Sequence, residues 1–187
     1  MVSLPRFITR LMSASSIALA VASSPVALPA ANPLTASEWS GPFGGVPPFD
    51  QVRVEHFKPA FDTAIEAYRA EIRAIAERSE PATFDNTIAA LERSGRMLDR
   101  VQAVYGVWSS TMSTPEFREV EQEMEPKLAA LRDEVFQNEK LFRRIEAVYQ
   151  APEKARLTAE QQRLVWFHYT NFVRAGARLD AAGKARV

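Results

Sequence analysis

The side chains best suited to metal or acid–base chemistry in this chain are two histidines. His56 and His168 are the only histidines, and more than a hundred residues separate them. Two histidines four residues apart on a helix, with a glutamate between them, bind zinc and supply a general base. Glu55 and His56 form only a fragment of that pattern, and a site made from both histidines and a carboxylate requires the fold to bring them together. We therefore interpret both as structural residues, His56 at a helix start and His168 partly buried within a helix.

The other charged clusters do not predict a catalytic site. Alternate residues of a helix do not share a face, so four glutamates spaced by two indicate a solvated surface rather than a metal site: Glu119, Glu121, Glu123 and Glu125. Three arginines at spacings of three and four indicate a solvated helix face, with binding of anions or peptide carboxylates as the alternative: Arg93, Arg96 and Arg100. We predict no catalytic, cofactor-binding or metal-ligating residue in this chain.

The composition describes an ordinary folded protein without a strong charge. Lys plus Arg and Asp plus Glu number 23 each among 187 residues, so the formal net charge is zero and nothing attracts nucleic acid or anionic lipid globally. Hydrophobic residues make up 47% of the chain and charged residues 25%, which is average for a globular domain. The chain has no cysteine. Disulfides, thiolate zinc sites and a cysteine nucleophile are therefore excluded.

The N-terminus, residues 1–31, has the layout of a signal peptide. Arg6 and Arg10 precede an apolar run from Leu11 to Ala22, and small residues follow near Ala30. This order of a basic start, a short apolar middle and a small-residue cleavage region is typical of export signals. The run is 12 residues long, whereas a membrane-spanning helix needs about 20. We predict export to the periplasm or secretion, with cleavage after Ala22 or near Ala30 and no stable membrane insertion afterwards; an uncleaved anchor or a non-functional leader is the alternative.

Residues 32–53 are predicted to be a Pro/Gly-rich lead-in, and residues 54–187 a helical segment. Pro and Gly break helices in the lead-in, and its rings are expected to pack onto the helical body: Trp39, Phe43 and Phe49. Beyond Val54, apolar residues recur at spacings of three and four. These spacings predict five helices, over residues 59–79, 83–108, 113–135, 138–149 and 158–179. No strand pattern appears, and short connections favour antiparallel neighbours. We predict an all-α, multi-helix antiparallel array.

Several residues predict where these helices begin, bend or end. Thr83 and Thr158 are expected N-caps, and the third helix begins either with a box from Ser113 to Glu116 or with a Thr114 cap before Pro115. Pro126 should kink or split that helix. Gly95 lies inside the second helix, where we expect a close helix crossing. The fifth helix still shows its period near the end of the chain.

Five motifs, in order along the chain, resemble zinc metallopeptidases of the thimet oligopeptidase and peptidyl-dipeptidase family, and the bacterial peptidyl-dipeptidase branch most. They are GPFGGVPPFD from Gly41, EHFKPAF from Glu55, TFDNTIAALERSG from Thr83, LDRV from Leu98 and FVRAGARL from Phe172. The resemblance covers roughly residues 33–187 and departs from the family at WFHYT, from Trp166 to Thr170.

The resemblance implies an all-helical enzyme much longer than this chain, whose N-terminal helices wall a channel that admits short, unfolded peptides. The family's zinc-binding His-Glu-x-x-His helix, whose glutamate activates a zinc-bound water, lies far downstream and is not present here. Zinc is thus implied for a complete enzyme but not for this chain, which alone should be inactive and lacks its catalytic domain. A stand-alone, exported, non-catalytic helical binding module is the alternative. A fragment should expose apolar helix surface, so we expect the isolated chain to self-associate or to be loosely packed.

Overall fold

The computed structural model describes residues 31–36, 38–40, 45–179 and 183. The chain divides into two units, Met1–Ala30 and Ala31–Val187, and the predicted signal peptide falls almost wholly in the first, outside the described residues. Within the described residues there is no strand, which confirms the all-α prediction. The helices are α1 (Phe57–Ala76), α2 (Ala89–Arg93), α3 (Arg96–Thr111), α4 (Pro115–Phe136), α5 (Glu139–Gln150) and α6 (Ala159–Arg174), with short helical turns η1 (Pro33–Thr35), η2 (Val54–His56), η3 (Phe84–Ile88) and η4 (Pro152–Arg156).

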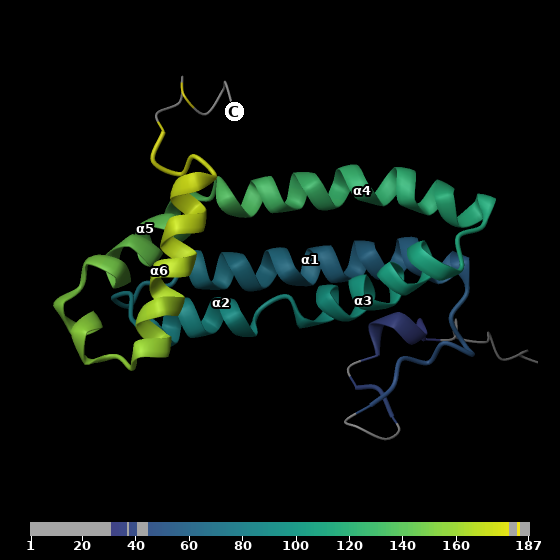
Figure 1. Cartoon of the computed structure of the whole chain (residues 1–187), viewed down its shortest axis with the longest axis horizontal. Coiled ribbons are helices and arrows are strands. Elements are labelled where there is room, and N and C mark those ends of the chain that lie inside the picture. Colours follow the sequence, from purple (N-terminus) through teal and green to yellow (C-terminus); the bar gives the residue numbers. More distant parts are fainter. Residues whose placement is uncertain (1–30, 37, 41–44, 180–182, 184–187) are drawn as a thin grey trace, which may run out of the picture. The chain divides into compact units, whose positions relative to one another are not determined.

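Helix α1 is the centre of the second unit (Figure 1). Helices α2 and α3 run back along it in the opposite direction, α4 reverses again, and α6 crosses the far end of this layer. The antiparallel prediction therefore holds for consecutive long helices, whereas α6 crosses them. In the described part of the chain, no helix is both long enough and apolar enough to cross a membrane.

Two hydrophobic clusters form the core. The first joins the N-terminal half of α1 to η1, α3 and α4, and rings pack edge to face within it, such as Phe57 on Phe117 with centroids 5.1 Å apart. The second joins the C-terminal end of α1 to η3, α5 and α6 through residues such as Ile72, Ile145 and Phe172. Burial of the period-3.6 stripes on α1 thus organises both ends of the fold.

The lead-in is tied to the first cluster. Leu34 is fully buried, and the Asn32 side chain donates to the carbonyl oxygen of His56 at 2.8 Å. Trp39 packs against this cluster as expected, whereas the Phe49 side chain is 40% exposed, so that part of the prediction is wrong. Phe43 lies outside the described residues.

The helix starts follow the predicted caps. The hydroxyl oxygens of Thr83, Thr114 and Thr158 accept from the backbone three residues on, at 3.2 Å each. The N-cap of α4 is Thr114, followed by Pro115 as the first helical residue, so the alternative of a capping box from Ser113 to Glu116 is wrong. Helix α4 continues through Pro126, so of the two predicted effects, a kink or a split, the split is wrong. Four residues earlier Gln122 is exposed, and its carbonyl, which Pro126 cannot bond, can bind water.

The predicted second helix is broken at Ser94 and Gly95. Gly95 has a φ of 78°, in the left-handed region, so one helix cannot run from Thr83 to Trp108. The chain here forms η3, α2 and then α3, with Gly95 as the N-terminal cap residue of α3. The expected close approach is real, because a Cβ on Gly95 would lie 3.2 Å from the Tyr68 ring.

The predicted fifth helix ends earlier than its periodicity suggested. Gly176, at a φ of 87°, follows the last turn of α6; its N–H donates to Val173 and that of Ala177 donates to Phe172, both at 3.0 Å. This is the Schellman arrangement that ends helices at a glycine. The helix therefore ends at Arg174, and the expectation that it continues to Leu179 is wrong.

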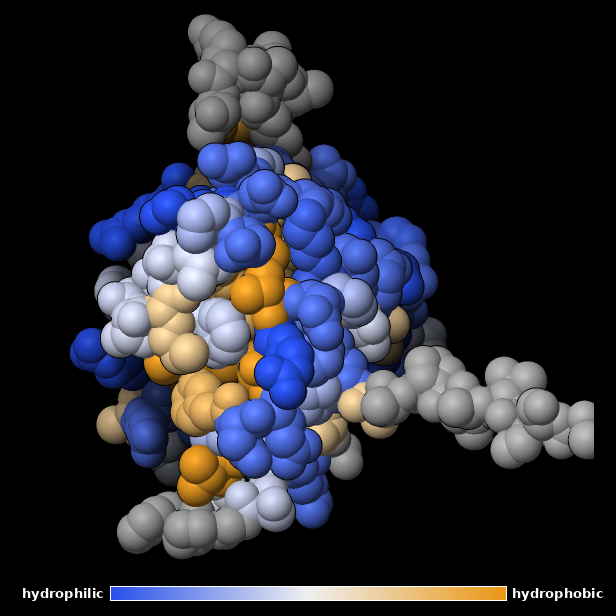
Figure 2. Space-filling view, turned by 90° about the vertical axis from the view of Figure 1, so that its right-hand side faces the viewer, coloured by the Kyte–Doolittle hydropathy of each residue, from blue (hydrophilic) through white to orange (hydrophobic). Residues whose placement is uncertain are grey.

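Large exposed apolar side chains gather at two places on the described helices. Figure 2 faces the end where α3 turns into α4, and apolar surface forms a narrow strip there between hydrophilic side chains. Val107 and Met112 belong to α3 and its end. The other place is α6, where Trp166 is 48% and Phe167 50% exposed.

Candidate functional site

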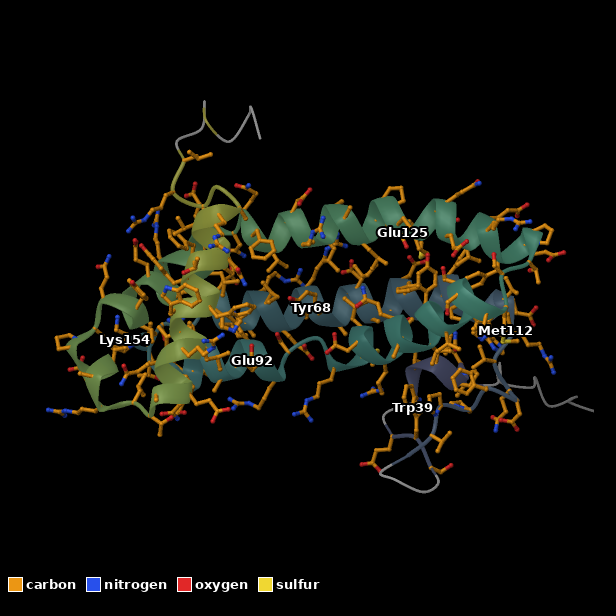
Figure 3. The ribbon with its side chains drawn as sticks, in the orientation of Figure 1. Trp39, Tyr68, Glu92, Met112, Glu125 and Lys154 are labelled. Carbon is orange, nitrogen blue, oxygen red and sulfur yellow. The ribbon has the colours of Figure 1, made fainter. Side chains whose placement is uncertain are left out.

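A cleft of about 640 Å³ opens between α3 and α4, with α1 beneath it and α6 at one end. Figure 3 shows Tyr68 of α1 between α4, which carries Glu125, and the α2–α3 segment, which carries Glu92. The cleft is lined by Tyr68, Leu91, Ser94, Gly95, Leu98, Asp99, Gln102, Tyr105, Glu125, Leu128, Ala129, Leu131, Arg132, Val135, Phe136, Phe167, His168, Asn171 and Phe172.

The floor of the cleft is the junction of the two core clusters. Tyr68 packs against both clusters and is only half-buried. The pKa of Tyr68 is raised, mainly by burial and to a smaller extent by the negative charges of Asp99 and Glu71. The phenol is therefore protonated at neutral pH. The described residues therefore fill this junction incompletely.

The break between α2 and α3 is held by a carboxylate from α1. Glu71 Oε2 accepts from the backbone N–H of Gly95 at 2.6 Å. A negative charge at a helix N-terminus also interacts favourably with the helix dipole. Asp99, in the first turn of α3, lines the cleft. Its pKa is raised, mainly by burial; the charge of Arg100 lowers this pKa, and the charge of Glu71 raises it further.

Each long wall presents one helical stripe to the cleft. On α4 the lining residues recur at spacings of three and four, namely Glu125, Leu128, Arg132 and Val135, and on α3 they are Leu98, Gln102 and Tyr105. This spacing places each set on one face of its helix. The stripes are apolar in part and carry charges of both signs.

Polar contacts order both ends of the cleft. At one end the Tyr105 hydroxyl donates to Glu125 Oε1 at 2.9 Å, and burial, followed by this bond, raises the pKa of Tyr105. At the other end His168 Nε2 lies 2.7 Å from Glu92 Oε1 and links α6 to α2. The His168 side chain is 16% exposed, which confirms it as a partly buried helix residue.

His56 lies at the opposite end of α1 from His168. Its Nδ1 accepts from the backbone N–H of Arg53 at 3.0 Å, so it is a helix-start residue as predicted. A helix of α1's 20 residues is about 30 Å long. The fold therefore does not bring the two histidines together.

The described residues do not fit a zinc ion. Nowhere among them do three or more His, Cys, Asp or Glu side chains gather so that they could hold a metal. Within the predicted glutamate run, Glu123 instead binds Lys58 at 2.6 Å and Lys127 at 2.9 Å, and Glu121 accepts from Ser109. No metal-dependent step can be derived for these side chains.

The arginine stripe does not line the cleft. Arg93 donates to the carbonyl oxygen of Asp85 at 3.3 Å, and Arg96 is exposed. Arg93 and Arg96 therefore agree with a helix face in solvent, whereas Arg100 departs from that prediction, because it is half-buried and its buried Nε has no hydrogen-bond partner among the described residues.

Within the described part of the chain, the fold thus forms a cleft lined by apolar side chains and by charges of both signs. Sequence reasoning did not identify the cleft residues Tyr68, Asp99 and Arg132, nor the pairing of Glu92 with His168. The available signal was a second stripe in the third predicted helix, offset from its core stripe and running from Glu125 to Val135.

Comparison with known proteins identifies the relatives of this chain. It is 39% identical over 141 residues, or 75% of its length, to the dipeptidyl carboxypeptidase of Escherichia coli, and 36% identical over the same share to that of Salmonella typhimurium. It is 26% identical over 72% of its length to the organellar oligopeptidase A of Arabidopsis thaliana. No protein-family model matches it.

The chain is homologous to peptidases of the thimet oligopeptidase family. This confirms the resemblance expected from the sequence motifs. The chain spans about a fifth of the length of these relatives, 21% of either dipeptidyl carboxypeptidase and 17% of the plant oligopeptidase, and matches a partial, N-terminal segment of the family.

Proposed function

We propose that this chain is the N-terminal channel-wall segment of a zinc-dependent peptidase that hydrolyses short peptides, acting as a peptidyl-dipeptidase or an oligopeptidase. The observation that carries the proposal is the 39% identity to a dipeptidyl carboxypeptidase across three quarters of the chain. Identity of that extent within one contiguous all-helical segment supports the same structural role in both proteins.

The site chemistry supports a wall rather than a catalytic centre. The cleft has an apolar floor and charged rims, and the described residues hold no metal-binding group. Zinc and the catalytic base would belong to a part of the enzyme outside these residues. The basic and apolar pattern of residues 1–31 supports export, so we place the activity in the periplasm or outside the cell.

The first experiment is to sequence the gene beyond the codon for Val187. The proposal expects an open frame that later encodes His-Glu-x-x-His. The full product should then hydrolyse short peptides, a chelator should abolish this activity, and changing the motif glutamate to glutamine should abolish it without unfolding the protein.

The contrary result is equally clear. A stop codon directly after Val187, together with no hydrolysis by the purified chain, would remove the peptidase proposal. The chain would then be a non-catalytic binding module, and its cleft would be the surface to test.

A further inference from the structure

The cleft between α3 and α4 has the length and the lining of a space that one further helix would fill. Both walls are helices whose lining residues recur at spacings of three and four, the pattern by which helices pack against a further helix. From Glu125 to Phe136 the α4 wall is about 16 Å long at the helical rise of 1.5 Å per residue. That length matches about three turns of a helix laid along it.

The floor and one end of the cleft leave apolar surface uncovered. Leu128 and Val135, both half-buried, line it, and Phe167 of α6, also a lining residue, is 50% exposed. An amphipathic helix that lays its apolar face into such a groove would bury these side chains. Its stripe would meet Tyr68, where the two core clusters join.

Three charged side chains on the rims form no ion pair within the described residues, although Glu125 accepts from the hydroxyl of Tyr105 and the charge of Arg100 acts on Asp99. The neighbouring α4 residues Glu123, Lys127 and Glu134 all form ion pairs with α1. Among the described side chains, by contrast, no ion pair includes Asp99, Glu125 or Arg132. Glu125 and Arg132 lie seven residues, or two turns, apart on one face of α4.

We propose that this cleft receives an amphipathic helix that presents a basic residue to Glu125 and, about two turns away, an acidic residue to Arg132. Its source is the portion of the peptidase chain that the relatives possess and this segment does not cover, about four fifths of their length. The inference of source rests on the proposed function, whereas the charge and shape of the occupant rest on the cleft alone.

The test uses the 187-residue chain and two stapled helical peptides of about 12 residues, because unstapled helices of this length are marginal in water. Both peptides carry the same apolar stripe and a lysine placed to meet Glu125. The residue placed to meet Arg132 is glutamate in one peptide and lysine in the other. Nitrogen–proton correlation NMR locates each peptide, and titration gives its affinity.

We expect the glutamate peptide to bind about fivefold more tightly than the lysine peptide, as a partly exposed ion pair of about 1 kcal/mol requires. Shifts should concentrate on the amides of Tyr68, Gln102 and Arg132. In the Arg132→Glu variant the preference should reverse. The matched control is Arg156→Glu, an equal charge change at an exposed η4 residue outside the cleft, which should leave the preference unchanged.

Three outcomes would overturn the inference. They are no shift at the cleft with either peptide, equal affinities that Arg132→Glu does not alter, and dimerisation of the chain through the cleft, detected by sedimentation and abolished by Leu128→Glu. The last would make a second copy the occupant. If the full-length enzyme hydrolyses substrate peptides but neither stapled peptide binds the cleft, this inference is wrong and the proposed function stands.

Discussion

At the scale of single residues, Gly95 fixes the geometry of the cleft because its backbone must be left-handed. The φ of 78° disfavours any larger residue, and so does the Tyr68 ring, 3.2 Å from the position that a Cβ would take. We expect Gly95→Ala to destabilise the fold by about 1–2 kcal/mol. Gly106, inside α3 with no neighbour within 4 Å of its Cβ position, is the control, and Gly106→Ala should stabilise by up to about 1 kcal/mol. Urea unfolding measures both; equal effects of the same sign would contradict this account.

Arg144 is the second residue with an outsized structural role. Its guanidinium donates to the carbonyl oxygens of Arg78 and Glu80 and to Asn86 Oδ1, each at 2.9 Å, and so fixes the connection between α1 and η3. Arg144→Met keeps the aliphatic stem but removes three hydrogen bonds and leaves the carbonyl oxygens of Arg78 and Glu80 without this donor, which should cost about 2–4 kcal/mol. Its neighbour Arg143 has a side chain 77% exposed, so Arg143→Met should change stability by less than about 0.5 kcal/mol. A similar loss in both variants, measured by thermal unfolding, would exclude this role.

These residues also show what the sequence could and could not reveal. Caps such as Thr114 and Thr158 were predictable because each bonds a backbone N–H only three residues away. The left-handed Gly95 was not, because Glu71 and Tyr68 of another helix determine it. Asp99 and Arg132 likewise could not be predicted as cleft residues, because they line the cleft only once α3 and α4 lie on either side of it.

At the scale of the elements, α4 is attached to α1 by an ion-pair cluster that responds to acid. Lys58 and Lys127 lower the pKa of Glu123 from 4.5 to about 2. A carboxyl group whose folded pKa is depressed stabilises the fold above its unfolded pKa and loses that contribution as the pH falls toward the folded one. Between pH 4.5 and about 2, the thermal midpoint should therefore fall further in the native chain than in Glu123→Gln.

The control for this acid response is Glu119→Gln, the same chemical change about one helical turn earlier on α4. Glu119 is exposed and forms no hydrogen bond or ion pair with the described side chains. Its variant should follow the native pH profile. Identical profiles for Glu123→Gln and the native chain would mean that solvent screens the cluster completely.

The end of α6 is the second element whose structure the periodicity alone concealed. The apolar residues Ala175 and Leu179 continue the helical spacing, but Gly176 permits the left-handed turn that ends the helix. The residues after Gly176 therefore leave the helix axis, although their apolar spacing would fit a longer helix. A period shows which face a helix buries, whereas the backbone freedom of one residue determines where that helix ends.

At the scale of the whole second unit, α1 and α4 each contribute to both core clusters, and among the described residues the cleft leaves the junction of the clusters unfilled around Tyr68. Clusters with little shared packing open with different free energies. We expect the isolated chain to unfold over a broad thermal range, with a van't Hoff enthalpy below the calorimetric one. Hydrogen exchange should give different opening free energies for Val101 in the first cluster and Ile145 in the second, and Tyr68→Ala should widen that difference. A sharp, fully cooperative transition from a monodisperse monomer would show instead that the packing along α1 and α4 couples the two clusters, and that the fold is complete without a helix in the cleft.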